Sequence, residues 1–205
     1  MNINGNNLLV SKASSKDDTR YNLKSVYFTK TATVATDGHI LARITYPLQY
    51  DDAELPAKDG EGPKGKAEEI TPFLIPAEAV KSIKAYKSKS LPMLTQIYVD
   101  VPKTNANGSA HFWATDLESV TAPAIKKMDA KFPPYEQIIP KTDKKPILTI
   151  GLDPALMGRA CDIASKAGLT GATFKLYDEN SAVLIEGRNV ETDQDVQIIV
   201  MPMRI

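Results

Sequence analysis

The sequence predicts an α+β fold, with antiparallel sheets on one side and helices on the other. Three segments are typical of strands because they are rich in β-branched and aromatic residues: YNLKSVYFTK, TATVATDGHILARITY and LTQIYVDV. Two further segments, FLIP and LTIGLDP, are short apolar strands that run directly into a helical pattern. Strand-dominated units with one helix each are the basis for this fold class.

The first hairpin can be placed from its turn residues. Asp37 and Gly38 predict a tight turn between TVA and ILARI, because glycine supplies the positive φ that a hairpin turn needs. The segment that follows, residues 49–69, is rich in proline, glycine and charge and has no periodicity, which predicts a solvated loop. Its glycines resemble a phosphate-binding loop, but no strand precedes them and no helix follows. We therefore do not expect nucleotide binding there.

Two helices follow the proline-containing strands. The first is expected over residues 77–89, after FLIP. The second has Asp153 as its N-cap, Pro154 at its first position and Gly168 at its far end. Cys161 lies beside the apolar stripe of this helix and is expected to be a small buried hydrophobe. That stripe consists of Leu156, Ala160, Ile163, Ala164 and Ala167.

Similar segments recur along the chain and predict an internal repeat. VATD at residues 34–37 recurs as WATD at residues 113–116. We distinguish three units, over about residues 1–50, 70–125 and 146–205, the first without a helix because NLLVSKASSKDDT is short and polar. These units predict a domain over residues 1–140 that holds two of them, and a half-domain over residues 141–205 that holds the third.

Composition excludes several classes of function. The 205 residues carry 25 basic and 25 acidic side chains, so any contact with nucleic acid must come from a local patch. No apolar stretch is long enough to span a membrane, and the N-terminus lacks the pattern of a signal peptide, so we expect a cytoplasmic protein. Two histidines and one cysteine, at no ligand spacing, predict no metal site and no cofactor. No catalytic motif occurs in its proper context, so we expect no catalytic residues and no enzyme.

The predicted helix over residues 77–89 has an uneven distribution of charge. Lys81, Lys84 and Lys87 lie three residues apart along one face, and the apolar residues lie along another. A lysine row is most often a solvated surface. If it contacted a phosphate backbone instead, each lysine would displace a counterion, and binding would be independent of sequence and sensitive to salt.

Three segments together resemble a known family. VATDGHILA (34–42), FPPYEQIIPK (132–141) and the terminal VMPMRI (200–205) resemble, in the same order, segments of the bacterial sliding clamp, the β subunit of DNA polymerase III. TRYNLKSVYF and FLIPAEAVKSI are also similar to segments of the clamp's middle domain. The resemblance implies the DNA-clamp fold, built from repeated strand-helix-strand units, with helices lining a hole and sheets forming the outer wall.

The resemblance also implies a function and partners. Clamps of this family bind duplex DNA without base readout, slide along it and tether polymerases as processivity factors. The residues that would face double-stranded DNA are Lys81, Lys84, Lys87, Arg159 and Lys166. Asp162 lies between the last two, which makes that helix the weaker candidate.

A peptide pocket is the second implied site, where clamps bind short motifs of DNA polymerases and other partners. One wall would come from Thr36, Gly38, His39 and Leu41, with Pro140 at its boundary; the other from Ile199, Met201, Pro202, Met203 and Arg204. Methionines give an adaptable apolar surface that accepts varied peptides. Ile40 stands where the family usually has arginine, which makes the rim less polar.

The chain departs from the family in length. Clamps of this family have three full domains and close as dimers, whereas this chain has about one and a half, so a ring of the usual size would need about four chains. We therefore expect a homo-oligomeric processivity factor that encircles or grips duplex DNA. The alternative is a truncated regulatory module that binds clamp-binding peptides without encircling DNA.

Overall fold

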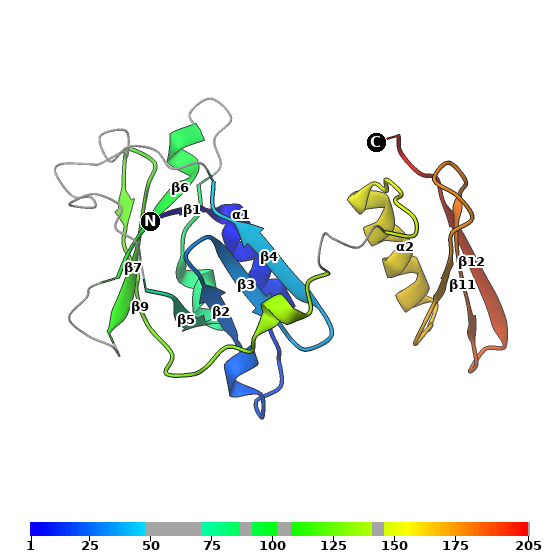
Figure 1. Cartoon of the computed structure of the whole chain (residues 1–205), viewed down its shortest axis with the longest axis horizontal. Helices are drawn as coiled ribbons and strands as arrows, with labels where there is room; N and C mark the ends of the chain where they lie inside the picture. Colours follow the sequence, from blue (N-terminus) through cyan, green and yellow to red (C-terminus); the bar gives the residue numbers. More distant parts are fainter. Residues whose placement is uncertain (48–70, 87–91, 102–107, 141–145, 205) are drawn as a thin grey trace. The chain divides into compact units, whose positions relative to one another are not determined.

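The computed structural model describes residues 1–47, 71–86, 92–101, 108–140 and 146–204. The chain forms two compact units, Met1–Glu136 and Gln137–Ile205, and each is described by itself. Figure 1 shows the first unit in blue to green and the second in yellow to red. The fold is mixed and dominated by sheet, with two α-helices among the described residues. The predicted loop at 49–69 lies outside the described residues.

The described residues of the first unit form two antiparallel sheets. One has the order β4-β3-β2-β5, formed by β2 (Ser25–Phe28), β3 (Ala32–Thr36), β4 (Leu41–Thr45) and β5 (Phe73–Pro76). The other has the order β1-β6-β7-β8, and β9 also pairs with β7. Its strands are β1 (Asn2–Asn4), β6 (Gln96–Asp100), β7 (Ser109–Thr115), β8 (Val120–Thr121) and β9 (Ala124–Lys126).

The two halves of this unit exchange their first strands. The first half contains β1 to β4, and the second half contains β5 to β9. β1 begins the first half but pairs with β6 of the second half, and β5 begins the second half but pairs with β2 of the first half. The registers match: Tyr27 lies opposite Leu74 and Val34, and Tyr98 lies opposite Asn2 and Trp113. Val34 and Trp113 begin VATD and WATD, so the repeated sequence occupies equivalent places in the two sheets.

A helix that we did not expect in the first half is present. α1 (Gly5–Leu8) continues into the 3-10 helix η1 (Leu9–Ala13). Asn4 caps it, accepting from the Asn6 N–H at 3.0 Å, while its own N–H donates to Asn7 Oδ1 at 3.1 Å. Asn7 is buried, and its amide nitrogen is satisfied there because it donates to the carbonyls of Ile44 and Thr45 at 3.1 and 3.0 Å. Tertiary hydrogen bonds therefore stabilise a segment too polar to form a helix by pattern.

The helix predicted over residues 77–89 is wrong in type and length. Over residues 77–86, the part of this range that the structure describes, the chain forms only a 3-10 helix, η4 (Ala77–Ser82), and Ile83 is already extended. Val80 and Ile83 are both buried, with exposed fractions of 7% and 6%. A 3-10 helix has three residues per turn, so a three-residue spacing places both side chains in the core. The other 3-10 helices in the described parts of the chain are η2 (Tyr21–Leu23), η5 (Pro92–Thr95) and η6 (Tyr135–Gln137).

The core of the first unit lies between its two sheets. Phe28 is fully buried, stacks on Phe73 with ring centroids 4.8 Å apart, and meets the edge of Phe112 at 5.7 Å. A second, smaller cluster covers the opposite face of the sheet that contains β2. There Phe132 stacks on Tyr27 at 5.0 Å, so the FPPYE segment packs across the outside of that sheet.

The second unit is one helix against one sheet. Helix α2 (Pro154–Lys166) packs against strand β12 (Gln194–Val200) of a sheet ordered β10-β11-β12, with β10 at Thr173–Lys175 and β11 at Val183–Asn189. The predicted caps are confirmed: Asp153 accepts from the Ala155 N–H at 2.7 Å, and Gly168 has φ +79°. The predicted LTIGL strand is reduced to one bridge between Gly151 and Met203.

The apolar stripe of α2 is only partly buried. Ala160 packs in one cluster with Val183, Ile185 and Val200 of the sheet, and Ala164 is also buried. Leu156 and Ile163 are 39% and 52% exposed, and Cys161 is also exposed. The expected burial of Cys161 is wrong because this unit has only one layer to cover its helix.

Candidate functional site

The ATDGH segment forms an ordered hairpin turn between β3 and β4. The Thr36 hydroxyl accepts from the Gly38 N–H at 3.1 Å and donates to the Ile40 carbonyl at 2.7 Å. The Asp37 carboxylate accepts from the N–H groups of His39 and Ile40 at 2.8 and 2.9 Å. Gly38 has φ +94°, as the sequence predicts for this turn. The turn is therefore held by its own side chains.

The exposed part of this turn is apolar and basic. His39 is exposed and Ile40 is 57% exposed, while Leu41 is half-buried against the small cluster that contains Phe132. Hydrogen bonds from Ile40 and His39 lower the pKa of Asp37, so its carboxylate stays charged at neutral pH. Arg20 donates a hydrogen bond to the Asp37 carbonyl at 3.0 Å, which further stabilises the turn.

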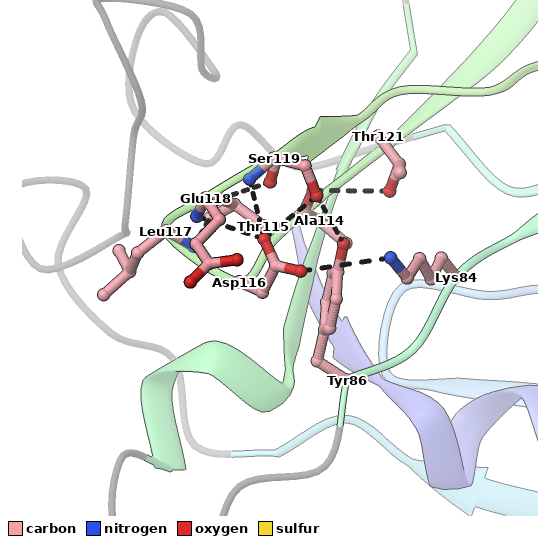
Figure 2. Close-up of polar contacts among 9 residues, drawn as sticks. All are labelled: Lys84, Tyr86, Ala114, Thr115, Asp116, Leu117, Glu118, Ser119 and Thr121. Carbon is pink, nitrogen blue, oxygen red and sulfur yellow. Dashed lines mark hydrogen bonds and ion pairs between the residues drawn. The ribbon is translucent and has the colours of Figure 1, made fainter.

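The same turn occurs again at the WATD segment (Figure 2). Thr115 accepts from the Leu117 N–H at 3.0 Å and donates to the Ser119 carbonyl at 2.8 Å. Asp116 accepts from the N–H groups of Glu118 and Ser119 at 3.1 and 2.7 Å. Hydrogen bonding by Ser119 is the main cause that lowers the pKa of Asp116 to about 2. The two turns have the same pattern of hydrogen bonds but present different side chains to solvent.

The two turns differ most at the position with positive φ, which gives a test. Gly38→Ala is expected to destabilise the protein by about 1 kcal/mol, because a Cβ is disfavoured at φ +94° and would lie 3.3 Å from Arg20 Nη1. Leu117 already has a side chain at φ +73° and is 51% exposed, so Leu117→Gly is expected to be neutral or stabilising by up to about 1 kcal/mol. Urea unfolding of both variants measures the difference, and equal destabilisation would contradict it.

The C-terminal tail presents apolar side chains beyond the last strand. Val200 is 4% exposed and ends β12, whereas Ile199, Met201 and Met203 are 68%, 63% and 53% exposed. The Met203 N–H donates to the Gly151 carbonyl at 2.9 Å, which fixes the backbone of the tail against its own unit. Pro202 is half-buried, and Arg204 and Pro140 are exposed.

The structure groups the expected peptide-contacting residues into two surfaces. The turn surface, in the first unit, consists of the exposed Gly38 and His39 and the half-buried Leu41, together with Thr36, which is itself buried. The tail surface, in the second unit, consists of Ile199, Met201, Pro202, Met203 and Arg204. Pro140 also belongs to the second unit.

The expected DNA-facing lysines do not form a helical row. Lys81 is exposed at the end of η4, and Lys84 lies beyond that helix. Lys87 lies outside the described residues. The Lys84 ammonium group lies 4.0 Å from Asp116 Oδ2 and 4.4 Å from the ring centroid of Tyr86 (Figure 2). Its pKa is raised, first by Tyr86 and then by Asp116.

Two basic residues on α2 lie on one face, because they are seven residues apart. Arg159 and Lys166 are both exposed. Lys166 pairs with Asp162 at 2.8 Å, one turn earlier. The charge of Asp162 therefore offsets part of the positive charge at this face.

Sequence reasoning missed the network around the second turn. The Tyr86 hydroxyl lies 3.4 Å from Ser119 Oγ, and Lys84 bridges Tyr86 and Asp116. The WATD repeat could have located this turn, but the approach of Lys84 and Tyr86 depends on the tertiary fold. Among the described residues, no cluster of histidine, cysteine and acidic side chains could hold a metal ion. In the same part of the chain, no helix is long and apolar enough to cross a membrane.

Comparisons with known proteins identify the fold. No model of a known protein family matches the chain, and no curated protein matches its sequence. The solved structure of the H. pylori beta clamp in complex with diflunisal matches with a TM-score of 0.58 and 14% identity, over 97% of this chain and 48% of the clamp chain. This chain thus spans about half the length of the clamp that it matches. At this identity the likeness shows the fold alone, and the chain has a clamp-like fold.

Proposed function

We propose that the protein is a sliding-clamp-like processivity factor, which holds duplex DNA and tethers a DNA polymerase and other partners through short peptides. The clamp-like fold supports this class of function. The observation that carries the proposal is the pair of surfaces at the VATDGHILA and VMPMRI segments. Both have backbones held by hydrogen bonds. The β3–β4 turn carries the half-buried Leu41 beside the exposed Ile40, and the tail carries the exposed Ile199, Met201 and Met203.

The turn surface and the tail surface suit the binding of short apolar peptides. The methionines of the tail surface adapt to different side chains, while the hydrogen-bonded turn stays preorganised and costs little entropy on binding. We propose that both surfaces contact the same class of partner peptide. Ile40, in the family's arginine position, would favour peptides with an apolar residue there.

A matched pair of variants tests the turn surface. His39 and Glu118 occupy equivalent places in the two turns, since each donates its N–H to the aspartate of its turn. His39→Ala is expected to weaken binding of a fluorescent peptide that carries a polymerase clamp-binding motif by about fivefold or more. Glu118→Ala should leave that affinity unchanged. Fluorescence anisotropy measures both, and equal effects would contradict the proposed site.

For DNA we propose contacts from Lys81, Lys84, Lys87, Arg159 and Lys166. A lysine or arginine that contacts phosphate releases a counterion, so Lys81→Gln and Arg159→Gln should each reduce the slope of log affinity against log salt by about 1. Lys30→Gln is the control, because Lys30 is exposed in the turn between β2 and β3. The slopes are obtained from the affinity for duplex DNA at several salt concentrations. Unchanged slopes in both test variants would exclude the proposed DNA contacts.

One observation favours the alternative function, a regulatory module that binds clamp-binding peptides without encircling DNA. Lys84 is engaged by Asp116 and Tyr86, and the expected row of lysines does not form on a helix. If the peptide affinity falls with His39→Ala while the salt slopes do not change, the alternative is the better description.

A further inference from the structure

Among the described residues, one strand edge of the second unit is not paired with another strand, whereas the equivalent edges in the first unit are paired. β10 is an end strand of a three-stranded sheet, and all three of its residues are exposed. β2 and β6 also follow the helical segments of their halves, but three of four and four of five of their residues are buried. The difference arises because β2 pairs with β5 and β6 pairs with β1, each contributed by the other half.

The second unit also has a segment equivalent to β5. Pro76 is the N-cap of η4, and two residues earlier the Leu74 carbonyl accepts from the Met128 N–H at 2.9 Å, just after the last strand of that half. Asp153 is the N-cap of α2, and two residues earlier the Gly151 carbonyl accepts from the Met203 N–H at 2.9 Å, just after β12. Residues 150–152 therefore correspond to residues 73–75.

This segment cannot pair with β10 of its own sheet. Gly151 lies beside the tail that follows β12, whereas β10 is at the opposite edge, with β11 between them. In the first unit, likewise, neither half pairs its first strand with its own second strand. Among the described residues no strand lies along the other edge of residues 150–152.

We propose that two copies of this chain complete their second units by reciprocal strand exchange. Residues 150–152 of each copy would pair with β10 of the other, giving two four-stranded sheets with the order of β4-β3-β2-β5. A second copy fits because one unit carries both the donor segment and the acceptor edge, so a single two-fold axis pairs both at once. The inference does not depend on the proposed function.

Exposed apolar side chains lie where this pairing would cover them. Phe174 of β10 is 44% exposed, and Leu176 just after it is 42% exposed. On α2, Leu156 and Ile163 are 39% and 52% exposed and lie on one face, seven residues apart. In the first unit the corresponding helical segments, η1 and η4, contact each other, so the two α2 helices would meet in the same way.

The mass of the full-length protein tests the pairing. Light scattering is expected to give an even multiple of the 22.4 kDa chain, with Phe174→Asp and Ile163→Glu each reducing that mass to half. Val190→Asp is the matched control, because Val190 is apolar and 87% exposed but lies in the turn between β11 and β12. A monomeric wild-type protein at high concentration, or unchanged masses in both test variants, would overturn the proposal.

Disulfide trapping tests the strand exchange itself and does not require a variant that disrupts assembly. In a Cys161→Ser background, one tagged chain carries Gly151→Cys and a second, differently tagged chain carries a cysteine at residue 173, 174 or 175. Co-expression is expected to give a disulfide between the two tags at one of these three positions, and none when Val190→Cys replaces the β10 cysteine. An assembly with no cross-link at any of the three would overturn strand exchange.

Discussion

Phe28→Ala is expected to destabilise the first unit strongly. Phe28 is fully buried, stacks on Phe73 and meets Phe112, so truncation leaves a cavity at the centre of the core between the two sheets. Large-to-small changes of this kind cost about 3–5 kcal/mol. A domain has only about 5–15 kcal/mol of stability, so this loss removes a large part of it.

Urea unfolding followed by near-UV circular dichroism measures this loss. Tyr21→Ala is the control, because that ring lies in the same unit, is 59% exposed, and its truncation leaves no enclosed cavity. The second unit has its own core around Ala160 and Ile185, so its helix signal should persist in Phe28→Ala. A loss below about 1 kcal/mol would contradict the assignment of Phe28 to the centre of the core.

Removing residues 201–205 is expected to abolish peptide binding and to leave the fold nearly intact. The deletion takes away the exposed Met201 and Met203, which are the two methionines of the tail surface, and leaves Ile199. Val200, which is buried against α2, remains. The structural cost is mainly one hydrogen bond, from the Met203 N–H to the Gly151 carbonyl, or about 1 kcal/mol.

Anisotropy with the labelled peptide and a thermal melt separate the two effects. Met203→Ser keeps the backbone hydrogen bond and should still weaken peptide binding, whereas Val190→Ser, at another exposed apolar position, should not. If the shortened chain unfolds, the tail is part of the core, and its role in binding is secondary. If the shortened chain folds and still binds the peptide with full affinity, the tail is not part of the binding site.

Local chemistry made some elements predictable from sequence. The Asp37-Gly38 turn and the caps at Asp153 and Gly168 depend on residues close together in the chain, and all three form as expected. The VATD and WATD repeat was visible in sequence because both turns use threonine and aspartate for the same hydrogen bonds.

The helical segments of the first unit were predicted poorly because distant contacts decide them, whereas α2 begins and ends where the sequence predicts. Residues 5–13 form a helical segment because Asn7 bonds to carbonyls of β4, which no local pattern reveals. Residues 77–82 form a 3-10 helix that ends at Ser82, and Val80 and Ile83 are both buried in the core. The row of lysines was expected along a longer helix, and Lys84 does not belong to it because the helix ends two residues earlier. Lys84 instead meets Asp116, thirty-two residues away in the sequence.

Hydrogen–deuterium exchange with and without the clamp-binding peptide tests the central claim most directly. The account predicts that the peptide slows exchange in residues 36–41 and in residues 199–204, and leaves the equivalent turn at residues 115–119 unchanged. Protection of the second turn alone, or no protection at either proposed surface with saturating peptide, would contradict a clamp-like peptide site in this protein.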